Sequence, residues 1–198
     1  MATRLTTYLQ HFDGGLAAHP TACMKASIVR EALLSRPLLE TTIRSVPMAL
    51  REVLREPPLP NAWLPVTYVA GTLLTIADQY GLDDETFVSW RREQYASLLS
   101  GPLYRMLFAV VSPEKLVQGA AYKLKSLAKD SLVVDHVETT RGNGEVKLSW
   151  PAHLIPPLLA RSLMEGVRAA LDLARAKNPK VQMRELTTTG ASYSLRWG

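Results

Sequence analysis

The spacing of apolar residues changes near Asp130, and this change constrains the fold more than any other feature of the chain. Up to that point apolar residues recur every three or four positions, as in helices, and beyond it they alternate, as in half-buried strands. Two alternating runs (131–150), an apolar helix (157–177) and two more alternating runs (180–197) follow. The order strand–strand–helix–strand–strand predicts an α+β fold, with a helical N-terminal part packed on an antiparallel sheet.

Local signals support each part of this order. In Arg141–Gly144 the chain has residues that tolerate positive φ, as a hairpin turn requires. We expect Leu163, Val167 and Leu171 to lie on the packed face of the helix over 157–177. Gly166 costs about 1 kcal/mol in a helix relative to alanine, so it indicates a close approach of a neighbouring group.

Six helices are expected in the first part of the chain. Ser45 is a plausible N-cap for a helix that has Pro47 in its first turn, and Asp83 or Asp84 can cap another. Gly81 stands where a helix C-terminus needs a left-handed residue. The expected helices cover about 25–34, 46–55, 62–80, 84–98, 103–111 and 113–129, and Ala62-Trp63-Leu64-Pro65 is expected to open the third of them.

Residues 1–24 have little periodicity and contain Gly14, Gly15 and Pro20. We expect them to form a partly ordered N-terminal extension. The remaining residues, 25–198, are expected to form a single α+β domain. It is helical over 25–130 and consists of sheet plus crossing helix over 131–198.

Composition restricts the class of protein. With 47% hydrophobic and 21% charged residues, the chain has the balance of a globular protein. A lone cysteine, Cys23, and a start without a signal-like apolar run indicate the cytoplasm, and no apolar stretch approaches a membrane span. The net charge is +5, with acidic residues interspersed, and residues 131–198 account for +3 of it. Lys115, Lys123, Lys125 and Lys129 are interpreted as a solvated helix face, with contact to an anionic partner as the alternative, and we expect no nucleic-acid partner.

No motif in the sequence carries a reaction. The four histidines have no carboxylate or nucleophile at a recognisable spacing, and His19 with Cys23 provides too few ligands for a structural zinc site. Asp83, Asp84 and Glu85 open a helix, where capping and the helix dipole explain them. We therefore predict that the protein is not an enzyme and has neither a metal nor a cofactor.

Large apolar and aromatic side chains are the remaining candidates for a binding site. We predict that a cavity, if present, lies between three helices and one strand, with tyrosine hydroxyls as its polar contacts. The alternative is that the same side chains form a tightly packed core. The residues concerned are Tyr104, Phe108, Tyr122, Trp150 and Met164.

Several short motifs together resemble a known family. These are Lys25-Ala26-Ser27, Ala62-Trp63-Leu64-Pro65, Gly101-Pro102-Leu103-Tyr104, and the Pro156…Gly166 helix with a terminal Leu195-Arg196-Trp197 strand. They look like the paralogous myxobacterial family of uncharacterised proteins, which is grouped with haem–nitric-oxide-binding, four-vinyl-reductase and transport-particle (TRAPP) subunit domains. The likeness covers about residues 25–198 and implies the same α+β fold. The wider group contains small-ligand sensors and trafficking or assembly subunits.

The haem branch of that group binds iron through a helical histidine and contacts the propionates with a Tyr-x-Ser-x-Arg motif. In this chain Tyr193-Ser194-Leu195-Arg196 has its arginine at another offset and lies on an expected strand. The expected helices over 103–129 contain no histidine. The resemblance therefore implies a relative that does not bind haem and is colourless when purified.

Two functional hypotheses remain. The first is a non-enzymatic cytoplasmic sensor or adaptor with an apolar small-ligand pocket. The second is a protein-interaction subunit with a filled core, which regulates a small GTPase or a motility or secretion assembly. Because the central helices have more apolar surface than one small sheet can cover, and related domains often pair, we expect a homodimer formed through the N-terminal helical region.

Overall fold

The four C-terminal strands form one antiparallel sheet, as predicted. The computed structural model describes residues 3–99 and 111–198. In the sheet order β4-β5-β7-β6, β7 lies between β5 and β6 and is antiparallel to both. The strands are β4 (Val133–Thr140), β5 (Asn143–Ser149), β6 (Lys180–Leu186) and β7 (Gly190–Arg196).

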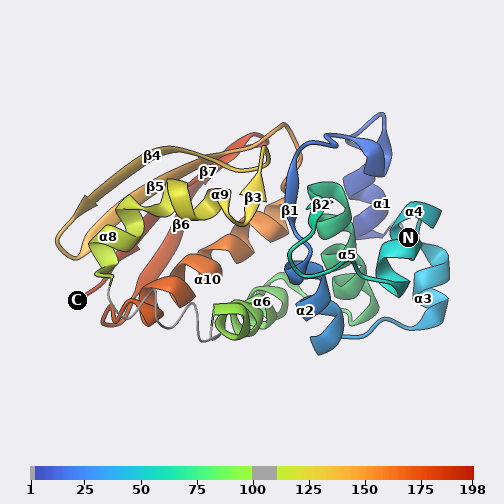
Figure 1. The fold of residues 1–198 in the computed structure, drawn as a ribbon, viewed down its shortest axis with the longest axis horizontal. Coiled ribbons are helices and arrows are strands. Elements are labelled where there is room, and N and C mark those ends of the chain that lie inside the picture. Colours follow the sequence, from blue (N-terminus) through green and yellow to red (C-terminus); the bar gives the residue numbers. More distant parts are fainter. Residues whose placement is uncertain (1–2, 100–110) are drawn as a thin grey trace.

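One face of this sheet is buried and the other is open. Val146 lies opposite Tyr193 on the buried face, while Glu145 lies opposite Ser194 on the open face. Helix α10 (Pro157–Leu173) crosses the buried face, and α8 (Pro113–Gln118) packs against β4 and β5 (Figure 1). On α10, Leu171 is fully buried, and Leu163 and Val167 pack against the core, which confirms the predicted inward face.

The helical part lies at the other end of the molecule in the view of Figure 1. Its centre is α5 (Val66–Gln79), which is buried on nearly its whole circumference because α1, α2 and α4 pack around it. Gly81, with a φ of +59°, follows this helix as predicted, and Asp83 Oδ1 accepts a hydrogen bond from the Thr86 N–H at the start of α6. The other helices here are α1 (Arg4–Leu9), α2 (Ser27–Ser35), α3 (Glu40–Ser45), α4 (Met48–Arg55) and α6 (Asp84–Leu99).

A second, small sheet lies between the two ends (Figure 1). It has the order β2-β1-β3 and consists of β1 (Cys23–Lys25), β2 (Trp63–Pro65) and β3 (Ala128–Lys129). This sheet was not predicted, and the expectation that residues 62–65 open a helix was wrong, because Trp63–Pro65 pairs with β1 as strand β2. Strands of two or three residues are too short to show a two-residue period.

The N-terminal segment is more ordered than expected. After α1 comes a 3-10 turn, Gly15–Ala17, and Leu5, Tyr8 and Leu16 are buried. The expectation of a partly ordered segment was wrong, because these apolar side chains pack against the helical core. The domain boundary at residue 24 stays a prediction.

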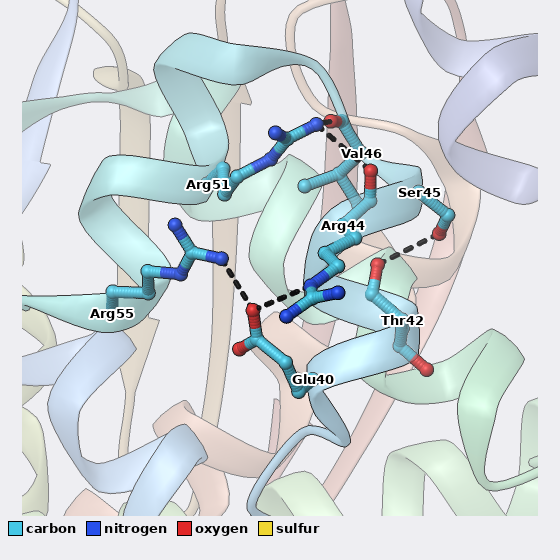
Figure 2. Close-up of polar contacts among 7 residues, drawn as sticks. All are labelled: Glu40, Thr42, Arg44, Ser45, Val46, Arg51 and Arg55. Atoms are coloured by element: carbon cyan, nitrogen blue, oxygen red, sulfur yellow. Dashed lines mark hydrogen bonds and ion pairs between the residues drawn. The ribbon is translucent and has the colours of Figure 1, made fainter.

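Two details of the helical prediction were also wrong. Ser45 ends α3 instead of capping the next helix, and its Oγ donates a hydrogen bond to the Thr42 carbonyl at 2.7 Å (Figure 2). The single helix expected over 113–129 is α8, then α9 (Ala120–Lys125), then strand β3, so its lysines do not share one helix face. The expected helix over 103–111 lies almost wholly outside the described residues.

Candidate functional site

Of the five predicted pocket residues the structure describes Tyr122, Trp150 and Met164, and these three do not share either of the two depressions described below. Tyr104 and Phe108 lie outside the described residues. Tyr122 is 84% exposed, so it is not part of an interior wall. Trp150 is buried, and its Nε1–H donates to the Thr188 carbonyl at 3.2 Å. Met164 is partly buried on α10, and its Sδ accepts a hydrogen bond from the Met183 N–H at 3.1 Å.

Met164 does border a groove, which lies between α6 and α10. The groove has a volume of about 290 Å³ and is open to solvent. It forms where the last helix of the N-terminal part packs on the helix that crosses the sheet. Its lining combines apolar and charged side chains: Asp84, Glu85, Val88, Ser89, Arg92, Arg161, Met164 and Glu165.

Four of the five charged side chains that line the groove, all except Glu85, form ion pairs. The side chain of Glu165 is 7% exposed and lies 3.3 Å from Arg92 Nε and 3.1 Å from Arg168 Nη1. Arg161 Nη1 lies 2.7 Å from Asp84 Oδ2 at the entrance. A nearly buried carboxylate requires such partners, because its desolvation is costly. Two guanidinium groups therefore hold Glu165 between the helices.

Below the groove the two helices approach closely, as the glycine at 166 predicted. A Cβ at Gly166 would lie 3.2–3.3 Å from the ring of Tyr95 on α6. Next to this contact, the Tyr193 hydroxyl donates to the Ala160 carbonyl at 3.0 Å. Burial, followed by the nearby Tyr95, raises the pKa of Tyr193 far above its ordinary value, so this hydroxyl stays a neutral donor.

Arg91 is the most unusual group in this region. It lies on α6 and is only 2% exposed. Its Nη1–H donates to Gln94 Oε1, and its guanidinium carbon lies 4.5 Å from the centre of the Tyr95 ring. Its Nε–H has no hydrogen-bond partner among the described residues.

No carboxylate of the described residues pairs with Arg91, and residues 100–110 contain no Asp or Glu. A buried guanidinium normally has an anionic partner, because the desolvation of an isolated charge costs roughly several kcal/mol. Arg91 is therefore a candidate contact for an anion that is not a protein side chain.

Neither Arg91 nor Glu165 was predicted as a functional residue. A signal for Arg91 was available, since it stands four residues after Phe87 and four before Tyr95 on the predicted buried face of its helix. Nothing in the sequence identified the partners of Glu165, which come from two helices far apart in the chain.

The α+β fold of this chain is similar to that of solved H-NOX domains. A family match over residues 92–198 then places the chain in the family described as "Protein of unknown function (DUF2378)". The match covers more than half of the sequence. No curated protein matches the chain.

Solved structures support the fold assignment. The Fe(II) unliganded H-NOX protein from K. algicida has a TM-score of 0.63 at 10% identity, with 88% of this chain and 97% of that chain covered. An oxygen-binding H-NOX domain related to soluble guanylate cyclases has a TM-score of 0.59 at 6% identity, with 86% and 91% covered. Identities this low show a shared fold, while the myxobacterial origin and the other relatives stay predictions.

The histidines of this chain do not fit a haem site of the helical type. His11 and His153, both outside helices, stack on one another with ring centres 4.3 Å apart. His19 lies in a loop against Phe12, and His136 lies half exposed on the edge strand β4 near Glu138. No histidine projects from a helix in the described part of the chain, and residues 100–110 contain none.

Two further features are absent from the described residues. They contain no group of three or more His, Cys, Asp or Glu residues placed to hold a metal ion. Among the same residues, no helix has both the length and the apolar character to cross a bilayer.

Proposed function

We propose that this chain is a non-enzymatic, cytoplasmic sensor or adaptor domain of the H-NOX-like fold that binds a small anionic molecule at Arg91 without haem. The observation that carries the proposal is the burial of the Arg91 guanidinium with no carboxylate beside it. The H-NOX-like fold supports a sensor role, since the solved relatives include an oxygen-binding domain. The alternative of a GTPase or motility regulator has no comparable observation in its favour.

The position of Arg91 suggests how binding is communicated. The Arg91 guanidinium lies over the ring of Tyr95, and this ring packs on Gly166 of α10. The next residue, Arg92, pairs with Glu165 of α10. An anion that moves Arg91 would therefore shift the packing of α6 on α10, and through α10 the sheet.

Stability and binding measurements on Arg91→Met test the proposal. Replacing an unpaired buried charge with an apolar side chain of similar length is expected to stabilise the ligand-free protein by about 1–4 kcal/mol. The control Arg92→Met removes the same charge from a half-exposed position on the same helix.

Thermal midpoints with and without millimolar citrate, acetate and phosphate, together with native mass spectrometry of the purified protein, give the binding result. We expect an anion to raise the midpoint of the wild type and of Arg92→Met but not of Arg91→Met. Strong destabilisation by Arg91→Met, with no anion effect on any variant, would assign Arg91 a purely structural role.

We also propose the homodimer through the N-terminal helical region. Large apolar side chains are exposed there, namely Leu34, Leu39, Met48 and Leu59. Light scattering at micromolar concentrations tests this, and a constant mass of 21.9 kDa would rule it out.

A further inference from the structure

A second depression lies at the far end of the four-stranded sheet, and its lining is strongly basic. It has a volume of about 570 Å³ and contains the side chains of Arg141, Lys177, Lys180 and Arg196. No Asp or Glu lines it. The remaining lining residues are Gly142, Asn143, Asn178, Trp197 and Gly198.

Two of the cations face each other directly across the sheet. Lys180 on β6 lies opposite Arg196 on β7, and the alternation of the strands places both on the open face. Like charges at directly opposite positions destabilise an antiparallel pair. Folding alone therefore does not favour this arrangement, whereas a shared anion between the two side chains would.

The four cations have no acceptor within the described part of the chain. None of their side chains forms a hydrogen bond or an ion pair there. Neighbours on the same face do have partners: Lys147 Nζ lies 3.7 Å from Glu145 Oε1, and Arg184 Nε donates to Ser194 Oγ at 2.9 Å. Unsatisfied positive charge is thus concentrated at this one end of the sheet.

The backbone holds these side chains in place. In the β4–β5 turn, Gly142 has a φ of +78°, and its carbonyl accepts a hydrogen bond from the Trp197 N–H at 2.8 Å. The Lys177 carbonyl accepts a hydrogen bond from the Gly198 N–H at 2.9 Å. The loop after α10 and the β4–β5 turn are therefore both fastened to the two residues that follow β7, so the backbone of the site is preorganised.

The carboxylate of Glu114, beside the depression, is already engaged. Glu114 on α8 accepts a hydrogen bond from Trp197 Nε1–H at 3.1 Å. If the chain ends at Gly198 with a free carboxylate, that group offsets one of the four positive charges, and an excess of three remains.

We propose that this basic depression binds a small molecule that carries two or more phosphate groups. Guanidinium and ammonium groups converging on one concavity suit clustered phosphate oxygens. The volume is within the range of small-molecule sites. A compact ligand fits better than nucleic acid, because the basic residues outside the depression are interspersed with acidic ones instead of forming a continuous track.

The test uses the full chain and inorganic tripolyphosphate as the probe, measured by isothermal titration calorimetry at low and at physiological salt. We expect Lys180→Gln and Arg196→Gln each to weaken binding at least tenfold. The matched controls Lys147→Gln and Arg184→Gln remove the same charges from the same sheet and are expected to change binding less than twofold.

Folding and rival ligands are controlled separately. Because Lys180 and Arg196 repel each other, their replacements should leave the thermal midpoint unchanged or raise it, so a loss of binding cannot be assigned to unfolding. Arg91→Met should bind the probe normally, which separates this site from the one proposed on α6. Absence of binding at low salt, equal losses in the controls, or tighter competing binding of duplex DNA or an acidic peptide would each overturn the proposal.

Discussion

The two ends of the molecule use their basic side chains differently. In the helical end, Arg44 Nε donates to Glu40 Oε1 at 3.0 Å, and Arg55 donates to the same oxygen (Figure 2). Arg51 Nη2 donates to the carbonyls of Arg44 and Val46, at 2.8 and 3.3 Å. In the depression at the end of the four-stranded sheet, the four basic side chains have no such acceptor among the described residues.

The contrast has a structural cause. Helices leave carbonyl groups without partners at their C-termini, and α3 and α4 are short, so many of their carbonyls are in that position. Arginine side chains supply the missing donors, as Arg51 does at the end of α3. In the four-stranded sheet the backbone groups pair with each other, so basic side chains are not needed for that purpose. Charge at the sheet end is therefore more informative about ligands than charge at the helical end.

The helical end and the sheet end can be compared as parts of one domain only if they unfold together. Phe87 on α6 and Leu195 on β7 are both fully buried and belong to one cluster of the core. We expect Phe87→Ala to cost about 3–5 kcal/mol and Leu195→Ala about 2–5 kcal/mol of unfolding free energy.

Urea unfolding followed by circular dichroism and by tryptophan fluorescence should show one transition for each variant, shifted to lower denaturant. Both ends contain tryptophans, Trp90 in one and Trp150 and Trp197 in the other, so fluorescence reports on both. Two separated transitions, with each variant affecting a different one, would contradict the single core.

The contact between the ends can be tested at Gly166. A methyl group there meets the Tyr95 ring at 3.2–3.3 Å, and such overpacking costs about 1–3 kcal/mol. Alanine is also a better helix former than glycine by about 1 kcal/mol. We therefore expect Gly166→Ala to lower the unfolding free energy by about 1 kcal/mol, the overpacking cost less the helix gain.

The control measures Gly166→Ala in a protein that also carries Tyr95→Leu. With the ring removed, Gly166→Ala should become neutral or stabilising, and the double-mutant cycle should show coupling. An equal effect of Gly166→Ala in both backgrounds would show that the glycine is not needed for the approach of α6 to α10.

The sequence predicted the sheet end better than the helical end, for a physical reason. A two-residue period over Glu145–Trp150 determines which side chains face the core, and Gly166 indicated a real close contact. Strands β1, β2 and β3 could not be found in the same way, because pairing with distant segments creates them. Helix α3 was missed because six residues provide too few turns for a clear period.

Neither candidate site could be derived from the sequence. The basic depression combines residues from the β4–β5 turn, the loop after α10 and two strands, and only the register places Lys180 against Arg196. The sequence showed a net charge of +3 over residues 131–198 but not where that charge gathers. Arg91 stands out because no carboxylate of the described residues lies beside it. Only the three-dimensional packing shows this.

Glu40 gives the smallest predicted effect and the most direct test of the difference between the two ends. Hydrogen bonds from Arg55 first, and then from Arg44, hold the pKa of Glu40 below its ordinary value of 4.5. A carboxyl group whose pKa is lower in the folded state stabilises the fold above its ordinary pKa. That stabilisation is lost as the pH falls through the lowered value.

Glu40→Gln should therefore lower the thermal midpoint slightly at pH 7, with a difference from the wild type that shrinks below pH 4.5 and with added salt, because the pair is exposed. Lys180→Gln at the sheet end should not lower the midpoint at either pH, since Lys180 has no described ion-pair partner to lose. Thermal unfolding followed by circular dichroism compares each of the two variants with the wild type at pH 7 and at pH 3. If Lys180→Gln destabilised the protein as Glu40→Gln does at pH 7, the basic residues at both ends would have the same structural role, and the argument for an anion at the sheet end would lose its basis.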